Sequence, residues 1–218
     1  MAYDLHTLGG QALLYWLPIT NFPFSMAVVA EHDSLATEGY PIGVGYNMGI
    51  GSNYHLGFRG DIAGDPVVMR RIPDGGGGGG SNSPQSAAYS INTETRIAFV
   101  ANAADDVALY VNGAKTTSTV SVGFPSAANY TSIGAFYGGG SISARCGGRV
   151  QQAAMCDLAA LTDDEVNSFM VGFSPRRIRP QSLKLYAPCL RLAYSITSGT
   201  VISLSNVTQA DQMRTYGM

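Results

Sequence analysis

The sequence has 218 residues, of which 13% are charged, whereas an average soluble protein has about 25%. Its 13 basic and 15 acidic side chains give a net charge of −2, which excludes the basic surface that nucleic acid or an anionic membrane would require. No apolar run reaches about 18 residues, so no transmembrane helix is expected. The first residues lack the positive region of a signal peptide.

From Phe24 onward, short β-like runs alternate with turn-rich breaks. Regular spacing of this kind predicts an all-β sandwich. We expect an N-terminal arm over residues 1–23, the sandwich over 24–172, and a return strand with a C-terminal arm, packed on the same domain, over 173–218. The predicted strands are Phe24–Ala30, Ile42–Tyr46, His55–Arg59, Val67–Arg71, Arg96–Ala101, Val107–Val111, Lys115–Val122, Tyr130–Ala135, Arg149–Cys156 and Leu183–Tyr186.

A glycine-rich segment separates two of these strands. Residues Asp74 to Pro84 include six successive glycines, Gly75–Gly80, and predict a loop because glycine is costly to order. The run lacks the Lys-Ser/Thr and the following helix of a phosphate-binding loop. If the loop is ordered, contacts within a crowded assembly are one explanation and a crystal contact is the other.

A two-residue hairpin is predicted at Asn112-Gly113, because both residue types accept the positive φ angles that such a turn needs. In the strand before it, Val107, Leu109 and Val111 share one face. Ala108 and Tyr110 face the other way, as the two-residue period of a strand requires.

A short helix is predicted after Leu161. Thr162 and Glu165 have the spacing of a capping box, and an apolar stripe follows before Gly172 provides a left-handed stop. Two to three turns of helix are marginal alone in water, so this helix is expected to pack on the sheet.

Candidates for catalysis are few. The histidines His6, His32 and His55 lie in separate segments without metal-ligand spacing, so no zinc site is predicted. His32 lies between Glu31 and Asp33, where it could act as an acid or base, but a surface turn explains it equally well.

Carboxylate pairs, the usual machinery for sugar cleavage, occur at Asp105-Asp106 and at Asp163-Asp164-Glu165. A turn explains the first pair and the start of a helix explains the second group. A glycan-cleaving sandwich would carry Glu-x-Asp-x-x-Glu within a strand. The one Glu-x-Asp here, Glu31-His32-Asp33, falls past the end of a predicted strand and has Ala36 in place of the last acid. The sequence therefore predicts no enzyme.

Cys146, Cys156 and Cys189 form an odd set without metal spacing and are expected to be reduced, buried thiols. No cofactor and no metal are predicted. The one basic cluster, Arg176, Arg177 and Arg179, lies between two prolines. It could make local salt bridges or anchor the chain on an acidic partner.

Several segments resemble concanavalin A-like or laminin-G-like jelly rolls over roughly residues 24–190. These are Thr95-Arg-Ile-Ala-Phe-Val, Asp106-Val-Ala-Leu-Tyr-Val-Asn-Gly-Ala-Lys115, Gly148-Arg-Val through Met155-Cys-Asp-Leu, and Leu161-Thr-Asp-Asp-Glu-Val to Gly172. The resemblance implies a jelly-roll β-sandwich with one short helix. Members of this family bind glycans, peptides or nothing, so the fold does not settle the ligand, and no calcium site maps onto this sequence.

The tail resembles those appended to such domains in virion proteins of tailed phages. The matching pieces are Ser174-Pro through Arg179-Pro, Leu183-x-x-Tyr-x-Pro188 and Ala210-Asp-Gln-Met-Arg-Thr-Tyr-Gly217. The resemblance implies a non-enzymatic structural protein of the virion. A capsid decoration or cement protein is expected, which forms a homo-oligomer and uses its terminal arms to contact the major capsid protein or another virion protein.

The residues expected to bind such a partner are Arg176, Arg177, Arg179, Tyr186 and Tyr216. The alternative function is a carbohydrate-binding, lectin-like module of a head fibre, tail or tail fibre. In that case exposed aromatic side chains, for example Tyr54 or Tyr137, would stack on sugar rings.

Overall fold

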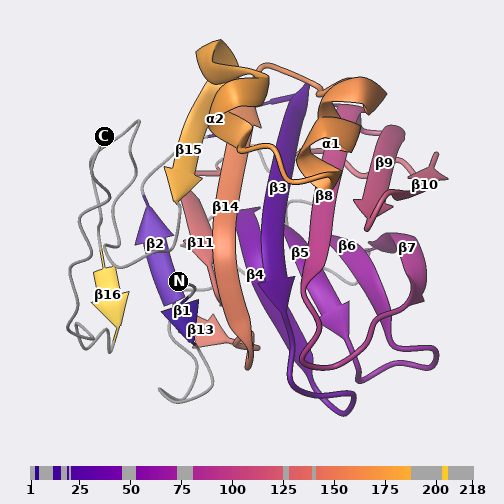
Figure 1. The fold of residues 1–218 in the computed structure, drawn as a ribbon, viewed down its shortest axis with the longest axis vertical. Helices are drawn as coiled ribbons and strands as arrows, with labels where there is room; N and C mark the ends of the chain where they lie inside the picture. Colours follow the sequence, from indigo (N-terminus) through magenta and orange to yellow (C-terminus); the bar gives the residue numbers. More distant parts are fainter. Residues whose placement is uncertain are drawn as a thin grey trace.

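The computed structural model shows a two-layered β-structure with short helices on one side (Figure 1). It describes residues 3–4, 12–15, 19, 21–45, 53–72, 81–124, 128–138, 141–187 and 203–205. Every strand pairing in these ranges is antiparallel. No helix among them is long and apolar enough to cross a membrane.

One layer, sheet A, has the order β1-β14-β3-β8-β9-β10, and β15 also pairs with β14. Its strands are β1 (Tyr3–Asp4), β3 (Phe24–Glu31), β8 (Thr95–Ala103), β9 (Asp106–Val111), β10 (Ala114–Ser118), β14 (Arg149–Asp157) and β15 (Leu183–Ala187).

The other layer, sheet B, has the order β16-β2-β11-β4-β5-β6-β7. Its strands are β2 (Ala12–Tyr15), β4 (Glu38–Gly45), β5 (Asn53–Arg59), β6 (Pro66–Ile72), β7 (Ser81–Ala88), β11 (Tyr130–Ile133) and β16 (Ser203–Ser205). A small hairpin of β12 (Phe136–Gly138) and β13 (Ser141–Ser143) stands beside it. The predicted jelly-roll β-sandwich is thus confirmed.

The main core lies between the two sheets. Strand periodicity decides which side chains enter it: in β9, Val107 and Leu109 point into this core, whereas Ala108 and Tyr110 point to the opposite face of sheet A. The faces predicted for this strand are confirmed. So is the turn after it, because Asn112 and Gly113 have φ angles of 49° and 89° and pair Val111 directly with Ala114.

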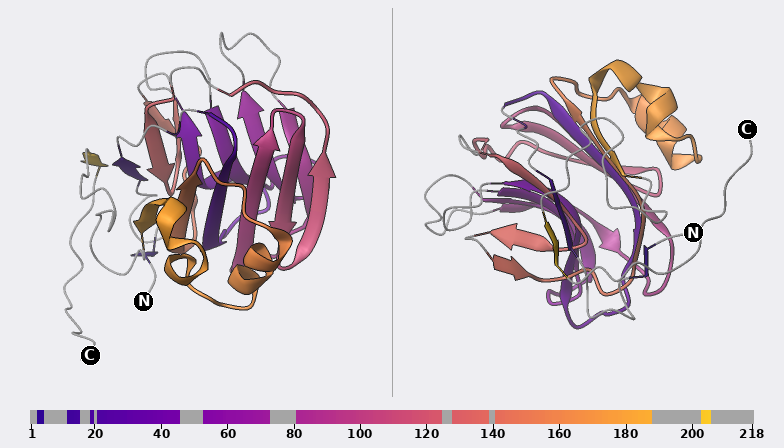
Figure 2. Two further views of the ribbon diagram at one scale, coloured as in Figure 1. Left: turned by 90° about the horizontal axis from the view of Figure 1, so that it is seen from above. Right: turned by 90° about the vertical axis from the view of Figure 1, so that its left-hand side faces the viewer.

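The outer face of sheet A is covered by α1 (Asp163–Met170), α2 (Pro175–Ile178) and the 3₁₀ turn η1 (Pro180–Ser182) (Figure 2). Val166 and Phe169 of α1 are buried there. Because helices cover one face and the core covers the other, β3 is buried along almost its whole length, and its sequence is accordingly a nearly continuous apolar run.

The predicted helix is confirmed at both ends. Thr162 and Glu165 form the capping box. At the other end Gly172 has φ +105°, and the N–H groups of Gly172 and Phe173 donate to the carbonyls of Phe169 and Ser168. This is the Schellman arrangement for which glycine is favoured.

Several details differ from expectation. Helix α2 was not predicted, and the strand predicted over Tyr130–Ala135 ends at Ile133. Residues 81–84, predicted as loop, begin strand β7, where Ser81 and Asn82 pair with Arg71 and Arg70. The strand predicted over Lys115–Val122 ends at Ser118. The strand predicted from Ile42 begins at Glu38, because a register shift between Gly39 and Ile42 lets it follow β5 further. Gly75–Gly80 lie outside the described residues.

Both terminal regions add strands to the sandwich. From the first 23 residues, β1 pairs with β14 and β2 pairs with β11. From the region after residue 172, β15 pairs with β14 and β16 pairs with β2. The described parts of both predicted arms are therefore paired within the sheets of the same chain.

Candidate functional site

The outer face of sheet B, away from the helices, carries a group of polar and aromatic side chains. Strand alternation places them: in β5, Leu56 and Phe58 enter the core, so His55 and Arg59 project from the other face. In β6, Met69 enters the core and Arg70 projects outward. The alternation of two ordinary strands thus puts two basic side chains on one face.

Aromatic rings form the base of this face. The ring of His55 lies over Gly43, where an added Cβ would come within 1.9 Å of it, and the ring of Tyr40 lies over Gly57, where the corresponding distance is 2.5 Å. Phe136 of β12 packs on both rings, with centroids 4.6 Å from His55 and 5.6 Å from Tyr40. His55 and Tyr40 are fully buried and Phe136 is half-buried.

Charged groups surround the ring of Tyr40. We call Glu38, Tyr40, Arg59, Asp61 and Arg70 the outer-face cluster. Arg59 donates two hydrogen bonds to Asp61, at 2.6 and 2.7 Å, and its Nε lies 3.5 Å from Glu38 Oε2. Glu38 and Arg59 are direct partners across β4 and β5, so sheet register brings them together.

Arg70 joins the charged groups to the rings. Its Nη1 donates to Tyr40 Oη at 2.8 Å and to Glu38 Oε2 at 3.3 Å, and the Tyr40 hydroxyl donates to Glu38 Oε2 at 2.9 Å. The guanidinium carbon lies 5.3 Å from the centre of the Phe136 ring and 5.8 Å from that of Tyr40. These distances are typical of cation–π contacts.

Burial fixes the protonation states around the cluster. It raises the pKa of Tyr40 to about 12, so the hydroxyl keeps its proton. Burial and the positive charge of Arg70 lower the pKa of His55 to about 3. His55 is therefore neutral, donating from Nδ1 to Asn53 Oδ1 and accepting at Nε2 from the Ser132 hydroxyl.

The cluster combines charged groups that are bonded to one another and partly exposed to solvent. The hydrogen bonds from Arg59 lower the pKa of Asp61, which makes its carboxyl a poor proton donor at neutral pH, whereas cleavage of a sugar bond needs a carboxylic acid with a raised pKa. The side chains of Glu38, Asp61 and Arg70 remain 32%, 33% and 31% exposed. They offer hydrogen-bond acceptors and donors side by side to a ligand.

His32 serves a structural purpose. It is buried against Phe58, accepts the Gly147 N–H at Nδ1 (3.3 Å) and contacts Thr37 O from Nε2 (3.2 Å). Burial lowers its pKa, although Thr37 and Asp33 act in the opposite sense. The expectation that His32 lies in a surface turn is wrong, because the side chain is buried, and its two engaged ring nitrogens favour a structural role over acid–base catalysis. His6 lies outside the described residues.

The predicted carboxylate groups have structural partners. Asp163 binds Lys115 and the Tyr110 hydroxyl, Glu165 binds Arg179, and Asp106 accepts from Asn102. Glu31 pairs with Arg149 at 3.1 Å. The contacts of Asp163 and Glu165 anchor α1, and the pair of Glu31 and Arg149 links the paired strands β3 and β14.

The predicted partner-binding residues lie in different environments. Arg176 and Arg177 are exposed on α2, and a role for them in partner binding stays a prediction. Arg179 instead donates to Glu165 and to the Ala160 carbonyl. Tyr186 is 8% exposed, with its hydroxyl 3.3 Å from Ser174 Oγ. Tyr216 lies outside the described residues.

The expectation that Tyr54 is exposed is wrong. Tyr54 is fully buried between the sheets, donates to the Val122 carbonyl and packs on Phe22, Phe24 and Phe124. Its strand presents His55 to the outer face instead. Tyr137 lies in β12, paired with Ile142 of β13, and its side chain is outside the described part of the chain.

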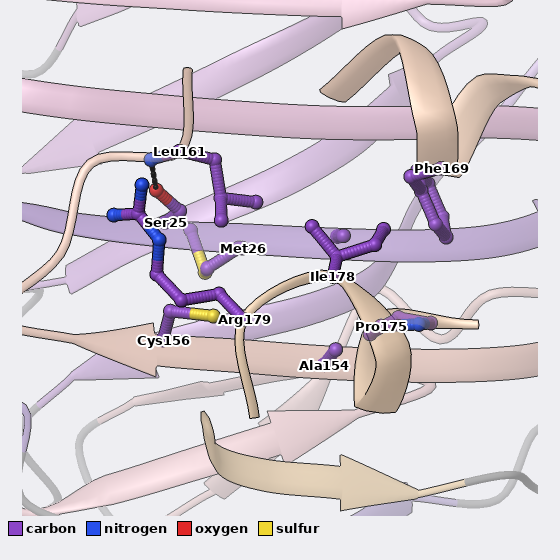
Figure 3. A pocket seen from close by; sticks show the side chains of 10 residues that line it. Ser25, Met26, Ala154, Cys156, Leu161, Phe169, Pro175, Ile178 and Arg179 are labelled. Atoms are coloured by element: carbon purple, nitrogen blue, oxygen red, sulfur yellow. Dashed lines mark hydrogen bonds between the residues drawn. The ribbon is translucent and has the colours of Figure 1, made fainter. Parts of the chain in front are cut away.

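A crevice lies between sheet A and the helices (Figure 3), and it is too small for a sugar. Its apolar lining includes Met26, Phe169, Pro175 and Ile178, and its free volume of about 10 Å³ is on the order of what one water molecule needs. Cys156 lies in its wall. This crevice is a packing gap beneath the helices.

Two of the three cysteines are described, and both Cys146 and Cys156 are buried free thiols, as predicted. Burial raises the pKa of Cys146 to about 12 and that of Cys156 to about 11, so neither is a thiolate at neutral pH. Cys189 lies outside the described residues. Within the described ranges, no three acidic, histidine or cysteine side chains gather as a metal site would require.

Sequence reasoning missed the outer-face cluster. Its members come from β4, β5, β6 and the turn after β5, and only the pairing of these strands brings them together. One signal was available: Arg70 and Arg71 are consecutive in a predicted strand, so one of them must face outward.

Comparison with solved structures shows that the fold is similar to those of known β-sandwich proteins. The CBM40 module of the Ruminococcus gnavus IT-sialidase bound to α2,3-sialyllactose has a TM-score of 0.56 and 16% identity, covering 78% of this chain and 91% of that one. The same module bound to α2,6-sialyllactose has a TM-score of 0.55 and 16% identity, covering 78% and 92%.

The native heptameric SAP-like pentraxin from Limulus polyphemus has a TM-score of 0.59 and 14% identity, covering 90% of this chain and 86% of that one. No protein-family model matches the sequence, and no curated protein matches it. At these identities the likeness concerns the fold. The predicted virion origin finds no support in these comparisons.

Proposed function

We propose that this protein is a non-catalytic glycan-binding module that holds its ligand at the outer-face cluster. The observation that carries the proposal is the position of Arg70: its partly exposed guanidinium stands beside Glu38 and over the rings of Tyr40 and Phe136, on the sheet face away from the helices.

The chemistry of the cluster suits a sugar. A sugar hydroxyl both donates and accepts hydrogen bonds, so a ring with neighbouring hydroxyls can accept from a guanidinium while donating to a carboxylate. Arg70 and Glu38 supply these groups side by side although β5 separates their strands, because Glu38 Oε2 lies 3.3 Å from Arg70 and 3.5 Å from Arg59. Their mutual bonds also hold them in place before a ligand arrives, which lowers the entropic cost of binding.

The similar CBM40 structures, bound to sialyllactose, support a glycan as the ligand, without indicating which sugar this site prefers. Capsid decoration, the other function expected from the tail sequence, stays a prediction. It draws no support from the outer-face cluster or from the similar folds.

A glycan array followed by titration calorimetry on the best ligand tests the proposal. Arg70→Ala should weaken binding by about tenfold or more, because a charge-assisted hydrogen bond is lost. Arg176→Ala is the matched control: it removes an exposed arginine from α2, on the opposite sheet, and should leave affinity unchanged. Absence of binding to every glycan, or equal losses in both variants, would overturn the proposal.

A further inference from the structure

The charges within the outer-face cluster are balanced, and this balance bears on which sugars it accepts. The arginines Arg59 and Arg70 face the carboxylates Glu38 and Asp61, and ion pairs of 2.6, 3.3 and 3.5 Å connect the four groups. The formal charge of the four groups therefore sums to zero. Two arginines without carboxylate partners would attract an anion, but here both arginines already pair with carboxylates of the cluster.

The two arginines are not equally available. Arg59 is almost buried and places two nitrogens on Asp61, with Nε also close to Glu38. Arg70 uses Nη1 for its bonds to Glu38 and Tyr40. Among the hydrogen bonds of the described residues, none involves Nε or Nη2 of Arg70, so these donors are left for a ligand.

The two carboxylate oxygens of Glu38 also differ in how many partners they have. Oε2 accepts from the Tyr40 hydroxyl and from Arg70, and lies near Arg59. Oε1 makes no hydrogen bond within the described part of the chain and is an acceptor for a ligand. A ligand that reaches Arg70 therefore also meets a carboxylate oxygen.

We propose that Glu38 makes this site select neutral sugar rings with neighbouring hydroxyls over sugars that carry a carboxylate. This inference rests on the proposed glycan-binding function. One hydroxyl of a diol donates a hydrogen bond to Glu38, and the other accepts a hydrogen bond from Arg70. A carboxylate can only accept, so it leaves Glu38 without a donor and places a second negative charge beside it.

Glu38→Gln is the informative substitution. The amide has nearly the same shape, and its oxygen still accepts from the Tyr40 hydroxyl and Arg70, but the negative charge is gone. The two arginines then face Asp61 alone, and the cluster acquires a net positive charge. Carboxylated sugars should bind the variant more tightly.

The experiment compares matched glycans, such as lactose and 3′-sialyllactose, by calorimetry at low salt. We expect the wild-type protein to favour the neutral member by about tenfold, and Glu38→Gln to remove or reverse this preference. Glu94→Gln is the control, because Glu94 also pairs with an arginine, Arg96, at 3.0 Å, but lies in the segment before β8 of the other sheet. Glu94→Gln should leave the ratio of the affinities for the neutral and the carboxylated glycan unchanged.

Each outcome bears on a different proposal. If the wild-type protein prefers carboxylated glycans, or if Glu38→Gln weakens both members of a pair equally, the role of Glu38 is wrong while glycan binding stands. If neither protein binds any glycan, whereas circular dichroism shows both folded, the proposed function itself fails, and this inference fails with it.

Discussion

Glu165 in α1 accepts two hydrogen bonds from the guanidinium of Arg179, at 2.8 and 2.6 Å, while the same carboxylate accepts the Thr162 N–H at 2.8 Å. One side chain thus closes the start of the helix and holds the segment that follows α2. Both side chains are 22% exposed, so solvent screens this pair only in part.

Glu165→Gln should destabilise the protein by about 1–2 kcal/mol at pH 7, because charged hydrogen bonds are lost while the amide oxygen can still cap the helix. Burial opposes ionisation of Glu165, but the Thr162 amide and Arg179 outweigh it and lower the pKa of its carboxyl. Its contribution is therefore complete above the ordinary pKa of about 4.3 and is lost as the pH falls through the lower folded value.

Urea denaturation at pH 7 and pH 3 measures both effects. The difference in stability between wild type and Glu165→Gln should shrink at the lower pH. Asp164→Asn, an exposed change in the same helical turn, should stay within about 0.5 kcal/mol of wild type. A difference that is the same at both pH values would show that charge on Glu165 does not stabilise the fold.

Ser25→Ala should cost about 1–3 kcal/mol. The buried Ser25 hydroxyl donates to the Ala159 carbonyl at 3.0 Å and accepts the Leu161 N–H at 2.9 Å (Figure 3), so its loss leaves two backbone groups without their partner. Thermal unfolding checks this. Ser168→Ala is the control, since that hydroxyl binds a carbonyl of its own helix, and its removal should be neutral or stabilising.

Gly43→Ala should destabilise the sandwich by about 2–4 kcal/mol and displace the His55 ring, because the new Cβ would lie 1.9 Å from it. Gly123→Ala meets nothing within 4 Å and should change stability by less than about 0.5 kcal/mol. Urea midpoints give both values. Near-equal midpoints for the two variants would mean that His55 does not lie on Gly43.

His55 should make the protein less stable in mild acid. Its pKa is about 3 in the folded chain and about 6.5 when unfolded, so only the unfolded state takes up a proton between these values. Stability contributed by the neutral ring is complete above pH 6.5 and declines below it, by about 2 kcal/mol at pH 5.

His55→Gln should therefore lose less stability than wild type when the pH is lowered from 7.5 to 5.0. His32, whose pKa is also lowered, remains in the variant, so part of the dependence of stability on pH remains as well. Urea midpoints at the two pH values give the comparison. If wild type and variant lose the same amount, His55 is accessible to protons in the folded state.

Sequence was sufficient wherever local chemistry decides the structure. The capping box at Thr162 and the turn at Asn112-Gly113 depend on neighbours within a few residues, and both were predictable from residue type. Strand β7 was not, because its serines, alanines and proline have low strand propensity. It forms because β6 offers it an unpaired edge.

The candidate site was hidden for a similar reason. Glu38 and Arg59 are 21 positions apart, as the numbering gives, and become neighbours only through the register of β4 and β5. Tyr54 and His55 show the same limit: both suit a strand, but which of them enters the core depends on the phase of the pleat. An error of one residue exchanges a core side chain for a surface one.

Gly43 and Gly57 set the depth of the outer face. Since the rings of His55 and Tyr40 occupy the space that their Cβ atoms would fill, the height of this surface is determined by side chains that are missing from the sheet below. Any substitution at these glycines can only raise the surface. A variant that accepts a bulkier ligand must therefore replace His55 or Tyr40 with a smaller side chain, because Gly43 and Gly57 beneath them have no side chain left to remove.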